Sequence, residues 1–365
     1  MSTSKPNIVI VTSEFPPQPG GIGNHAYNLA LHLSNQGHDV RVIADQRSKT
    51  GTEESDFDTS LPFSVDRIKL YNVRFLMYLK RIILTFKYTK SATHCIATGK
   101  FPLWNVAFSS FFFKRKTIAV VHGTEVNFKS VLLRKSIDFS LKRFDNIVAV
   151  SNYTKTLIAH LNKDVVVIPN GITTSEWKSS KDKINLKGQP VLTTVGRVSS
   201  RKGQLNVIKQ LPELIKEFPE LHYHCVGIPT EADAFMSVAE SLNVVSYITF
   251  HGSVDDDKLK QVLDATDIFV MLSTESVTGD VEGFGIAILE ANAMGIPAIG
   301  AKGCGIEDAI DSGNSGLLID VNNTNEFVEG VSQILANTSK FKTEAMTWAN
   351  AHDWSHVIKR YEELL

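Results

Sequence analysis

Two patterns of hydrophobic residues alternate along the chain. Short runs rich in Val and Ile, bounded by Gly, Pro and polar residues, alternate with longer stretches whose apolar positions recur three or four residues apart. This alternation is typical of βα units that build a parallel sheet. The apolar runs predict strands at residues 8–11, 40–44, 95–97, 118–121, 147–150 and 165–168, and again at 191–195, 222–226, 247–250, 268–272, 298–299 and 317–319.

The longer stretches predict helices between these strands, at residues 26–34, 205–217, 256–264, 286–293 and 325–335. We therefore expect an α/β protein with two Rossmann-like, doubly wound parallel-sheet domains, at residues 1–178 and 184–345, joined by a polar linker. Residues 346–365 form a C-terminal helix that we expect to pack back on the N-terminal domain. Its apolar face consists of Trp354, Ile358, Tyr361 and Leu365. Because ligands of such sheets bind at the carboxyl ends of the strands, we expect the site in a central cleft that both domains face.

Composition narrows the class of protein. The chain has 365 residues and a mass of 40.4 kDa, with 43% hydrophobic and 21% charged residues, which is typical of a folded protein and excludes disordered and fibrous ones. Its cysteines, Cys95, Cys225 and Cys304, are far apart, so neither a disulfide framework nor a cysteine zinc site is indicated. The N-terminal stretch does not read as a signal peptide, and no apolar run is long enough to cross a bilayer. We expect a cytoplasmic protein that meets lipid only peripherally, on the inner face of the cytoplasmic membrane.

The charges are distributed unevenly. The formal net charge is −1, yet residues 1–180 contain 23 Lys and Arg against 13 Asp and Glu, and the remainder contains 15 against 26. Residues 67–116 contain eleven Lys and Arg, no Asp or Glu, and large apolar side chains between them. This composition suits a surface that meets anionic lipid headgroups; an aromatic core beneath a solvated basic face is the alternative. A pI of 6.8 and the lack of a recognisable nucleic-acid-binding module disfavour nucleic acid as a partner.

A glycine-rich loop follows the first predicted strand. Residues 21–26 match the dinucleotide-binding fingerprint, and Asp45 closes the next strand as a ribose-binding acid would. In a dehydrogenase the first glycine follows its strand almost at once, whereas residues 13–19 intervene here. A nicotinamide-dependent enzyme is therefore disfavoured. The loop still suits a phosphate, because main-chain N–H groups at a helix start attract anions.

Two loops in the second half carry charged side chains. The loop 196–203 holds Arg197 and Lys202, a pair that suits a diphosphate and its developing charge, although a solvated basic turn is the alternative. Farther along, Glu282 lies in a glycine-rich turn and Glu290 follows eight residues later, within a predicted helix. The main-chain N–H groups of residues 283–285 would point at an anion, and the two carboxylates would accept hydrogen bonds from hydroxyl groups.

Taken together, the motifs resemble a known family. In chain order they are the Gly20-Gly21 loop, residues 121–125 (VHGTE), 150–154 (VSNYT), 168–172 (IPNGI), the loop 196–203, and an E-x7-E motif from Glu282 to Glu290. The E-x7-E motif is highly specific here, because it lies within EGFG and is followed by LEA and GIP. Over essentially its whole length the chain resembles the retaining glycosyltransferases of family 4, which have the GT-B fold.

The resemblance implies a role for each residue that matches a motif. A nucleotide-diphosphate sugar would bind with its nucleotide on the C-terminal domain, where Arg197 and Lys202 hold the diphosphate and Glu290 binds the ribose hydroxyls. Gly21 would approach the diphosphate from the N-terminal domain. His122 would lie near the sugar C6 hydroxyl and the reaction centre, although a histidine that ends a strand before a glycine is more often structural. The remaining expected donor-binding residues are Glu282, Gly283, Phe284, Gly285 and Ile286, which hold the sugar and phosphates, and Val254, near the base; the expected catalytic residues are His122, Glu282, Arg197 and Lys202.

The resemblance also implies the reaction. The family retains the anomeric configuration, with the leaving diphosphate taking the acceptor's proton, so neither a metal nor another cofactor is expected. The motifs look most like those of GDP-mannose-dependent phosphatidylinositol mannosyltransferases. Mannose is therefore the expected hexose and a glycan or lipid-linked molecule the expected acceptor, in the synthesis of glycoconjugates or cell-surface polysaccharides such as lipopolysaccharide. A UDP-sugar-dependent transferase and a non-catalytic sugar-nucleotide-binding subunit that regulates a partner are the alternatives.

Overall fold

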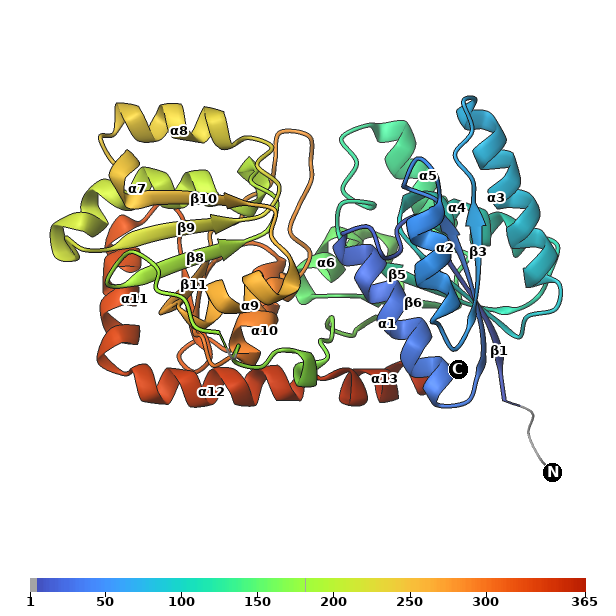
Figure 1. Ribbon diagram of the computed structural model, residues 1–365. Helices are drawn as coiled ribbons and strands as arrows, with labels where there is room; N and C mark the ends of the chain where they lie inside the picture. Colours follow the sequence, from blue (N-terminus) through green and yellow to red (C-terminus); the bar gives the residue numbers. More distant parts are fainter. Residues whose placement is uncertain (1–4, 181) are drawn as a thin grey trace. The chain divides into compact units, whose positions relative to one another are not determined.

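The chain divides into two compact units (Figure 1). The computed structural model describes residues 5–180 and 182–365. Outside the described residues lie residues 1–4, which belong to the N-terminal stretch that was not expected to be a signal peptide, and Lys181 of the predicted linker. The first unit comprises Met1–Asn170 and Trp354–Leu365, and the second comprises Gly171–Asp353. The segment that returns to the first unit therefore begins at Trp354, whereas the C-terminal helix expected from the sequence began at residue 346.

Within the described residues, a parallel sheet of seven strands forms the middle of the first unit, in the order β3-β2-β1-β4-β5-β6-β7. Its strands are, in chain order, β1 (Asn7–Thr12), β2 (Asp39–Asp45), β3 (Ser64–Ile68), β4 (His94–Thr98), β5 (Lys116–Val121), β6 (Asn146–Ala149) and β7 (Val165–Val167). Ile8 of β1 lies in register with Val40 on one side and with His94 on the other. Strands β1 and β5 read as runs of Val and Ile because they are buried on both faces.

Strand β3 was not predicted, because its sequence is mostly polar. It lies at the edge of the sheet, where only its last residue, Ile68, is buried. Charged side chains hold it in place instead: Asp66 of β3 accepts a hydrogen bond from Arg41 of β2 at 2.6 Å. An edge strand of this kind lacks the apolar run by which a central strand is recognised.

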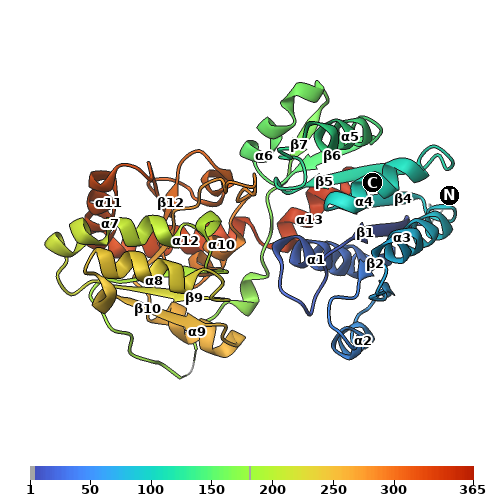
Figure 2. The same ribbon diagram turned by 90° about the horizontal axis from the view of Figure 1, so that it is seen from above.

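Helices cover both faces of this first sheet (Figures 1 and 2). They are α1 (Gly21–Asn35), α2 (Thr52–Thr59), α3 (Arg74–Thr89), α4 (Lys100–Ser109), α5 (Val131–Leu141), α6 (Asn152–Leu157) and α13 (Trp354–Glu362). Helix α13 buries Trp354, Val357, Ile358 and Tyr361, so the predicted apolar face is confirmed except that Val357 replaces Leu365. The carbonyl oxygen of Leu365 accepts a hydrogen bond from Lys116 at 2.8 Å, which ties the end of the chain to β5.

In the part of the chain that the structure describes, the second unit is built on a parallel sheet of six strands, in the order β10-β9-β8-β11-β12-β13. Its strands are β8 (Val191–Val195), β9 (His222–Val226), β10 (Ile248–Gly252), β11 (Ile268–Met271), β12 (Ala298–Ala301) and β13 (Gly316–Ile319). Its helices are α7 (Gln204–Glu217), α8 (Ala232–Ser241), α9 (Asp256–Asp264), α10 (Ile286–Ala293), α11 (Thr324–Ala336) and α12 (Thr338–Ala351). All six predicted strands are confirmed, and α9 and α10 have their predicted bounds.

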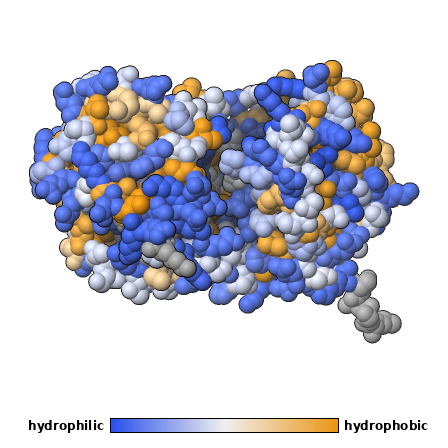
Figure 3. All heavy atoms as spheres, in the orientation of Figure 1, coloured by the Kyte–Doolittle hydropathy of each residue, from blue (hydrophilic) through white to orange (hydrophobic). Residues whose placement is uncertain are grey.

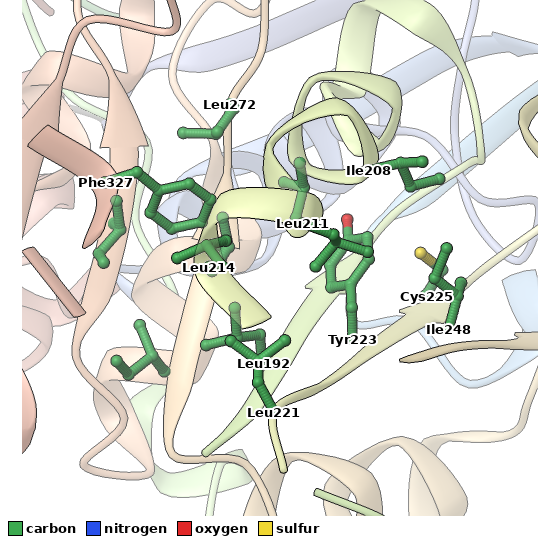
Figure 4. Packing of buried hydrophobic residues seen from close by; sticks show 14 of the residues in the cluster. Leu192, Ile208, Leu211, Leu214, Leu221, Tyr223, Cys225, Ile248, Leu272 and Phe327 are labelled. Atoms are coloured by element: carbon green, nitrogen blue, oxygen red, sulfur yellow. The ribbon is translucent and has the colours of Figure 1, made fainter. Parts of the chain in front are cut away.

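The core of the second unit packs side chains of α7 and α11 against one face of its sheet (Figure 4). Leu211 and Leu214 of α7 and Phe327 of α11 are fully buried there, against Leu192 of β8 and Tyr223 of β9. Each fully buried Leu or Phe contributes about 1.5–3 kcal/mol of transfer free energy. This core fixes the sheet, and with it the loops that leave the ends of its strands.

Each sheet reverses its strand order once, and the loops at that point carry the predicted site residues. In the second unit the reversal lies between β8 and β11, whose following loops contain Lys202 and Glu282. In the first unit it lies between β1 and β4; the loop after β1 leads to Gly21, and His122 follows the neighbouring strand β5. Such reversal points are where open α/β sheets bind ligands.

Candidate active site

A three-residue charge cluster occupies the reversal point of the second unit. Lys202 Nζ lies 2.8 Å from Oε2 of Glu282, and Nη1 of Arg201 donates to the same oxygen. The Glu282 side chain is 12% exposed, against 15% for Lys202 and 29% for Arg201. The cluster is therefore mostly shielded from water, so its charges interact more strongly than surface charges do.

Two glycines bring the backbones of this cluster together. Gly203 ends the turn that carries Arg201 and Lys202; its φ is +84°, and an added Cβ would lie 2.1 Å from the carbonyl oxygen of Leu272. Gly305 approaches the other loop, donating its N–H to the carbonyl oxygen of Glu282 at 3.0 Å. A Cβ at Gly305 would lie 2.1 Å from the carbonyl oxygen of Gly283. Only glycine fits either position without moving the backbone.

The charge state of Glu282 follows from its neighbours. Burial by itself would raise the pKa of Glu282, but the charges and hydrogen bonds of Lys202 and Arg201 outweigh burial and hold the pKa below its usual value. Glu282 is therefore a carboxylate at neutral pH. Since the two cations flank it, the cluster carries a net positive charge, which suits an anionic ligand.

Glu290 has the opposite environment. It lies on α10, half-buried, and burial raises its pKa to about 7; Lys202 lowers it, whereas Asp256 and Glu176 raise it further. A carboxyl group that changes charge near neutral pH stands close to the charge cluster, since Lys202 influences both glutamates. Perturbed carboxyl groups of this kind gather at functional sites.

The first unit positions His122 at the end of β5. Its Nε2 is hydrogen-bonded to the hydroxyl of Thr98 at 2.8 Å, and its main-chain N–H donates to the carboxylate of Glu125. Burial lowers the pKa of His122 to about 3, so the imidazole is neutral. The ring of His25, from α1, packs edge-on against it with the centroids 5.0 Å apart.

The first unit contributes two further candidate groups. Gly21 is the first residue of α1, and a Cβ added there would meet no atom within 4 Å, so the space into which a side chain would point is open. Burial raises the pKa of Glu125 to about 7; the N–H groups it accepts and Lys100 act against burial, while Glu14 adds to it. Oε2 of Glu125 is buried without a hydrogen-bond partner among the residues that the structure describes.

Comparison with known families identifies the chain. The model of the family "Glycosyltransferase Family 4" matches residues 19–176, and that of "Glycosyl transferases group 1" matches residues 175–353. Together the two matches span residues 19–353, and they meet at residues 175–176, close to the boundary between the units after Asn170. The chain belongs to the family 4 glycosyltransferases and has the GT-B fold.

Individual relatives of this glycosyltransferase agree with that assignment. The chain is 25% identical to the GDP-mannose-dependent α-(1-6)-phosphatidylinositol monomannoside mannosyltransferase of Mycolicibacterium smegmatis, with 98% of each chain covered. It is 21% identical to a phosphatidylinositol N-acetylglucosaminyltransferase subunit of Saccharomyces cerevisiae, covering 98% of this chain and 82% of that protein. Among solved structures, HepE of Anabaena with UDP and glucose superposes with a TM-score of 0.77 at 18% identity, over 98% of both chains.

One basic residue of this glycosyltransferase was missed from the sequence. The motif directed attention to Arg197, but Arg197 is exposed, and the guanidinium that pairs with Glu282 belongs to Arg201. The signal was present, because Arg201 immediately precedes Lys202 in the chain. What the sequence lacks is the direction of each side chain on the turn that ends at the left-handed Gly203.

The remaining predicted donor-binding residues lie around the same loop. The Phe284 side chain is 1% exposed and lies 6.1 Å, centroid to centroid, from His352, so only its main chain is available to a ligand. Gly285 has a φ of +94° and precedes Ile286, the half-buried first residue of α10. Val254, also half-buried, lies between β10 and α9.

Asp45 has a structural role. Arg81 of α3 donates through Nε to its Oδ1 at 2.7 Å, and both residues are buried. The carboxylate that the dinucleotide fingerprint would assign to a ribose is thus occupied by a guanidinium.

Among the described residues no group of three or more His, Cys, Asp or Glu side chains is placed to hold a metal ion.

Proposed function

We propose that this glycosyltransferase moves a hexose, mannose by preference, from a nucleotide-diphosphate sugar to a lipid-linked or glycan acceptor with retention of configuration. The observation that carries the donor class is the cluster of Arg201 and Lys202 at the strand-order reversal of the second unit. A guanidinium and an ammonium on one glycine-bounded turn match the charge and geometry of a diphosphate. The named activities of the relatives support the acceptor class: one is a phosphatidylinositol monomannoside mannosyltransferase and another is a subunit of a phosphatidylinositol N-acetylglucosaminyltransferase.

The chain's own residues would stabilise the leaving group. As the bond between the sugar C1 and the diphosphate breaks, Arg201 and Lys202 neutralise the charge that develops on the phosphate, and the exposed Arg197 adds a third cation on the same loop. The acceptor oxygen bonds to C1 on the face that the diphosphate leaves, and its proton passes to the departing phosphate oxygen. Positioning and electrostatics would carry the reaction, which is why no metal is proposed.

Glu290 and His122 would orient the donor. With a pKa near 7, Glu290 is substantially ionised at neutral pH and can accept hydrogen bonds from the ribose hydroxyls. The neutral imidazole of His122 uses Nε2 to contact Thr98, which leaves Nδ1 as the ring nitrogen for a sugar hydroxyl. A neutral histidine suits this task, because it adds no positive charge beside the electron-deficient sugar carbon.

A surface of the first unit supports a lipid-linked acceptor. Aromatic side chains on this surface contact one another in two groups: Phe86 of α3 lies 5.3 Å from Phe112, and Phe111 lies 6.4 Å from Phe139 of α5, between ring centroids. Figure 3 shows hydrophobic side chains gathered over α3. The large apolar side chains on this surface that are at least 50% exposed are Val73, Phe75, Ile83, Phe111, Phe112, Val131, Leu132 and Phe139. We call these eight residues and the basic residues between them the apolar-basic surface.

The basic residues make this surface suitable for anionic lipid. Two of the eleven in residues 67–116 form ion pairs, Arg67 with Asp58 and Arg81 with Asp45. The other nine have no acidic residue among them in sequence. None of the helices described is long and apolar enough to cross a membrane. We therefore propose peripheral docking on anionic lipid, on the inner face of the cytoplasmic membrane, as the way the enzyme reaches its acceptor.

The donor is tested by thermal unfolding with GDP-mannose, UDP-glucose, UDP-galactose and UDP-N-acetylglucosamine. We expect GDP-mannose to raise Tm most, because each ligand stabilises the native state according to its affinity. A larger shift with a UDP-sugar would replace this donor by the second candidate, which the likeness to a structure holding UDP and glucose favours. Transfer of radiolabelled mannose to a total lipid extract, followed by NMR of the product's anomeric centre, tests retention; an inverted product would contradict it.

A further inference from the structure

The cations that the proposed function assigns to the diphosphate already hold an anion. Arg201 and Lys202 both donate to Oε2 of Glu282, and the carboxylate is ionised. A diphosphate oxygen that binds the same two cations carries the same charge and accepts the same hydrogen bonds as that carboxylate oxygen. The ligand and Glu282 therefore compete for one pair of cations.

The main chain around Glu282 is held in place, whereas among the described residues its carboxylate is held only by the ion pairs with Arg201 and Lys202. The main chain is fixed at Gly305 N–H and by the close approach of Gly305 to Gly283. Lys202 is fixed in its turn by its own N–H, which donates to Ser199. The charge cluster consists of side-chain contacts only, so an exchange of anions needs rotamer changes and no movement of the loops.

We propose that Glu282 is a built-in competitor of the diphosphate: it neutralises Arg201 and Lys202 in the empty site, is displaced by an incoming donor, and returns to expel the nucleoside diphosphate after transfer. This inference rests on the proposed nucleotide-diphosphate donor. In the donor complex the displaced carboxylate accepts hydrogen bonds from sugar hydroxyls, which compensate the broken ion pairs. Once the sugar has left, that compensation is lost and Glu282 reclaims the cations. Donor is thereby favoured over product at the same phosphate contacts.

The competitor role makes a prediction opposite in sign to that of a simple sugar-binding residue. In Glu282→Gln the neutral amide binds the two cations far less well than a carboxylate does, so GDP and UDP meet unoccupied cations. Their affinity should rise by about 5- to 10-fold, the worth of a charge-assisted hydrogen bond discounted for partial exposure. Transfer should fall in the same variant, because the sugar contacts weaken. A residue that only bound the sugar would leave the affinity for GDP and UDP unchanged.

Calorimetric titration of GDP and UDP into wild type, Glu282→Gln and Glu307→Gln tests the exchange. Glu307 is exposed in the segment Gly305–Ala309 and accepts an N–H of Gly303, so its amide variant removes the same charge without breaking the ion pairs. We expect tighter binding in Glu282→Gln and a change below about twofold in Glu307→Gln, as for an exposed charge. Equal gains in both variants would overturn the exchange in favour of a general charge effect.

A double-mutant cycle with Arg201→Gln isolates the pair. On that background Glu282→Gln should gain much less GDP affinity, because one of the two cations it would release is gone. Glu282→Asp, whose carboxylate is one methylene shorter, should show a smaller gain in the same direction and replaces Glu282→Gln if that variant does not fold. Unchanged or weaker GDP and UDP binding in both Glu282 variants would overturn the exchange alone. No binding of GDP or UDP by the folded wild type would overturn the proposed donor itself, and the exchange with it.

Discussion

The hydroxyl of Tyr361 lies 3.0 Å from Nε2 of His25, and both groups are buried. This contact joins the C-terminal helix α13 to α1, the helix that begins with Gly21. His25 in turn packs on His122, so the end of the chain supports a predicted catalytic residue through one intermediate side chain.

Tyr361→Phe should therefore lower stability and activity together. The substitution leaves Nε2 of His25 buried without its partner, which costs about 1–2 kcal/mol of unfolding free energy. Chemical denaturation measures this loss, and donor turnover should fall because His122 is less firmly held. His356→Ala, at an exposed position of the same helix, should change neither. A Tyr361→Phe protein as stable as wild type would show that the contact contributes nothing.

Removing Lys202 or Glu282 should abolish transfer while the protein stays folded. Lys202→Ala takes away a cation that would neutralise the leaving diphosphate, and we expect a loss of at least about 100-fold in turnover. Glu282→Ala removes the expected contact with the donor sugar. Rates with saturating donor, together with circular dichroism to verify folding, measure both. Substantial turnover in both variants would disprove the assignment of the site.

The donor KM should depend on pH through Glu290. Its pKa is raised to about 7, so the carboxylate that would accept ribose hydrogen bonds is lost as the pH falls below 7, and KM should rise there. The contribution of Glu290 to the free energy of unfolding changes with pH in the opposite direction to donor binding. The folded protein keeps a proton that the unfolded chain releases above pH 4.5, so this contribution decreases as the pH rises from about 4.5 to 7.

Amide variants separate the two glutamates whose pKa lies near 7. Glu290→Gln should remove the pH dependence of the donor KM, whereas Glu125→Gln, in the other unit, should retain it. If KM of the Glu290→Gln enzyme still rises on acidification, the titrating group is a different one.

The apolar-basic surface should bind vesicles that contain anionic lipid and release them in high salt. Phe75 and Phe112 are 66% and 62% exposed, and replacing both by Ser should weaken binding at least about tenfold, because two aromatic side chains no longer enter the lipid. Val277→Ser is the control, since Val277 is 99% exposed in the other unit. Cosedimentation measures binding, and equal binding by all three proteins would remove this surface from the proposal.

Gly203→Ala should cost about 3 kcal/mol or more of unfolding free energy, since the left-handed backbone strain adds to a clash with the Leu272 main chain. Gly313→Ala is a matched control: its φ is +91°, but a Cβ there meets nothing within 4 Å, so only the strain of about 1 kcal/mol remains. Denaturation midpoints compare the two. Equal losses would mean that the loop after β11 moves aside to accept a Cβ at Gly203.

The sequence alone predicted the parts of the fold that repeat a local pattern. Runs of Val and Ile located β1 and the other buried strands, because a strand covered on both faces must be apolar along its length. The edge strand β3 was not predicted, because its polar residues form ion pairs and face water. The E-x7-E spacing likewise located Glu282 and Glu290 on one loop and helix, because that spacing is set by the chain itself.

What only the tertiary structure decided are the partners of each charged side chain. Asp45 had the position of a ribose-binding acid, but a buried ion pair with Arg81, from a helix more than thirty residues away in sequence, occupies it. Phe284 lies within a functional motif, yet its side chain turns into the core. Arg201, rather than Arg197, meets Glu282 because the turn that ends at Gly203 points it there. Sequence spacing determines which residues share a helix, strand or loop. Which of these side chains contact one another depends on their rotamers and on loops that distant strands bring together. Rotamers and loop positions are determined only when the chain has packed.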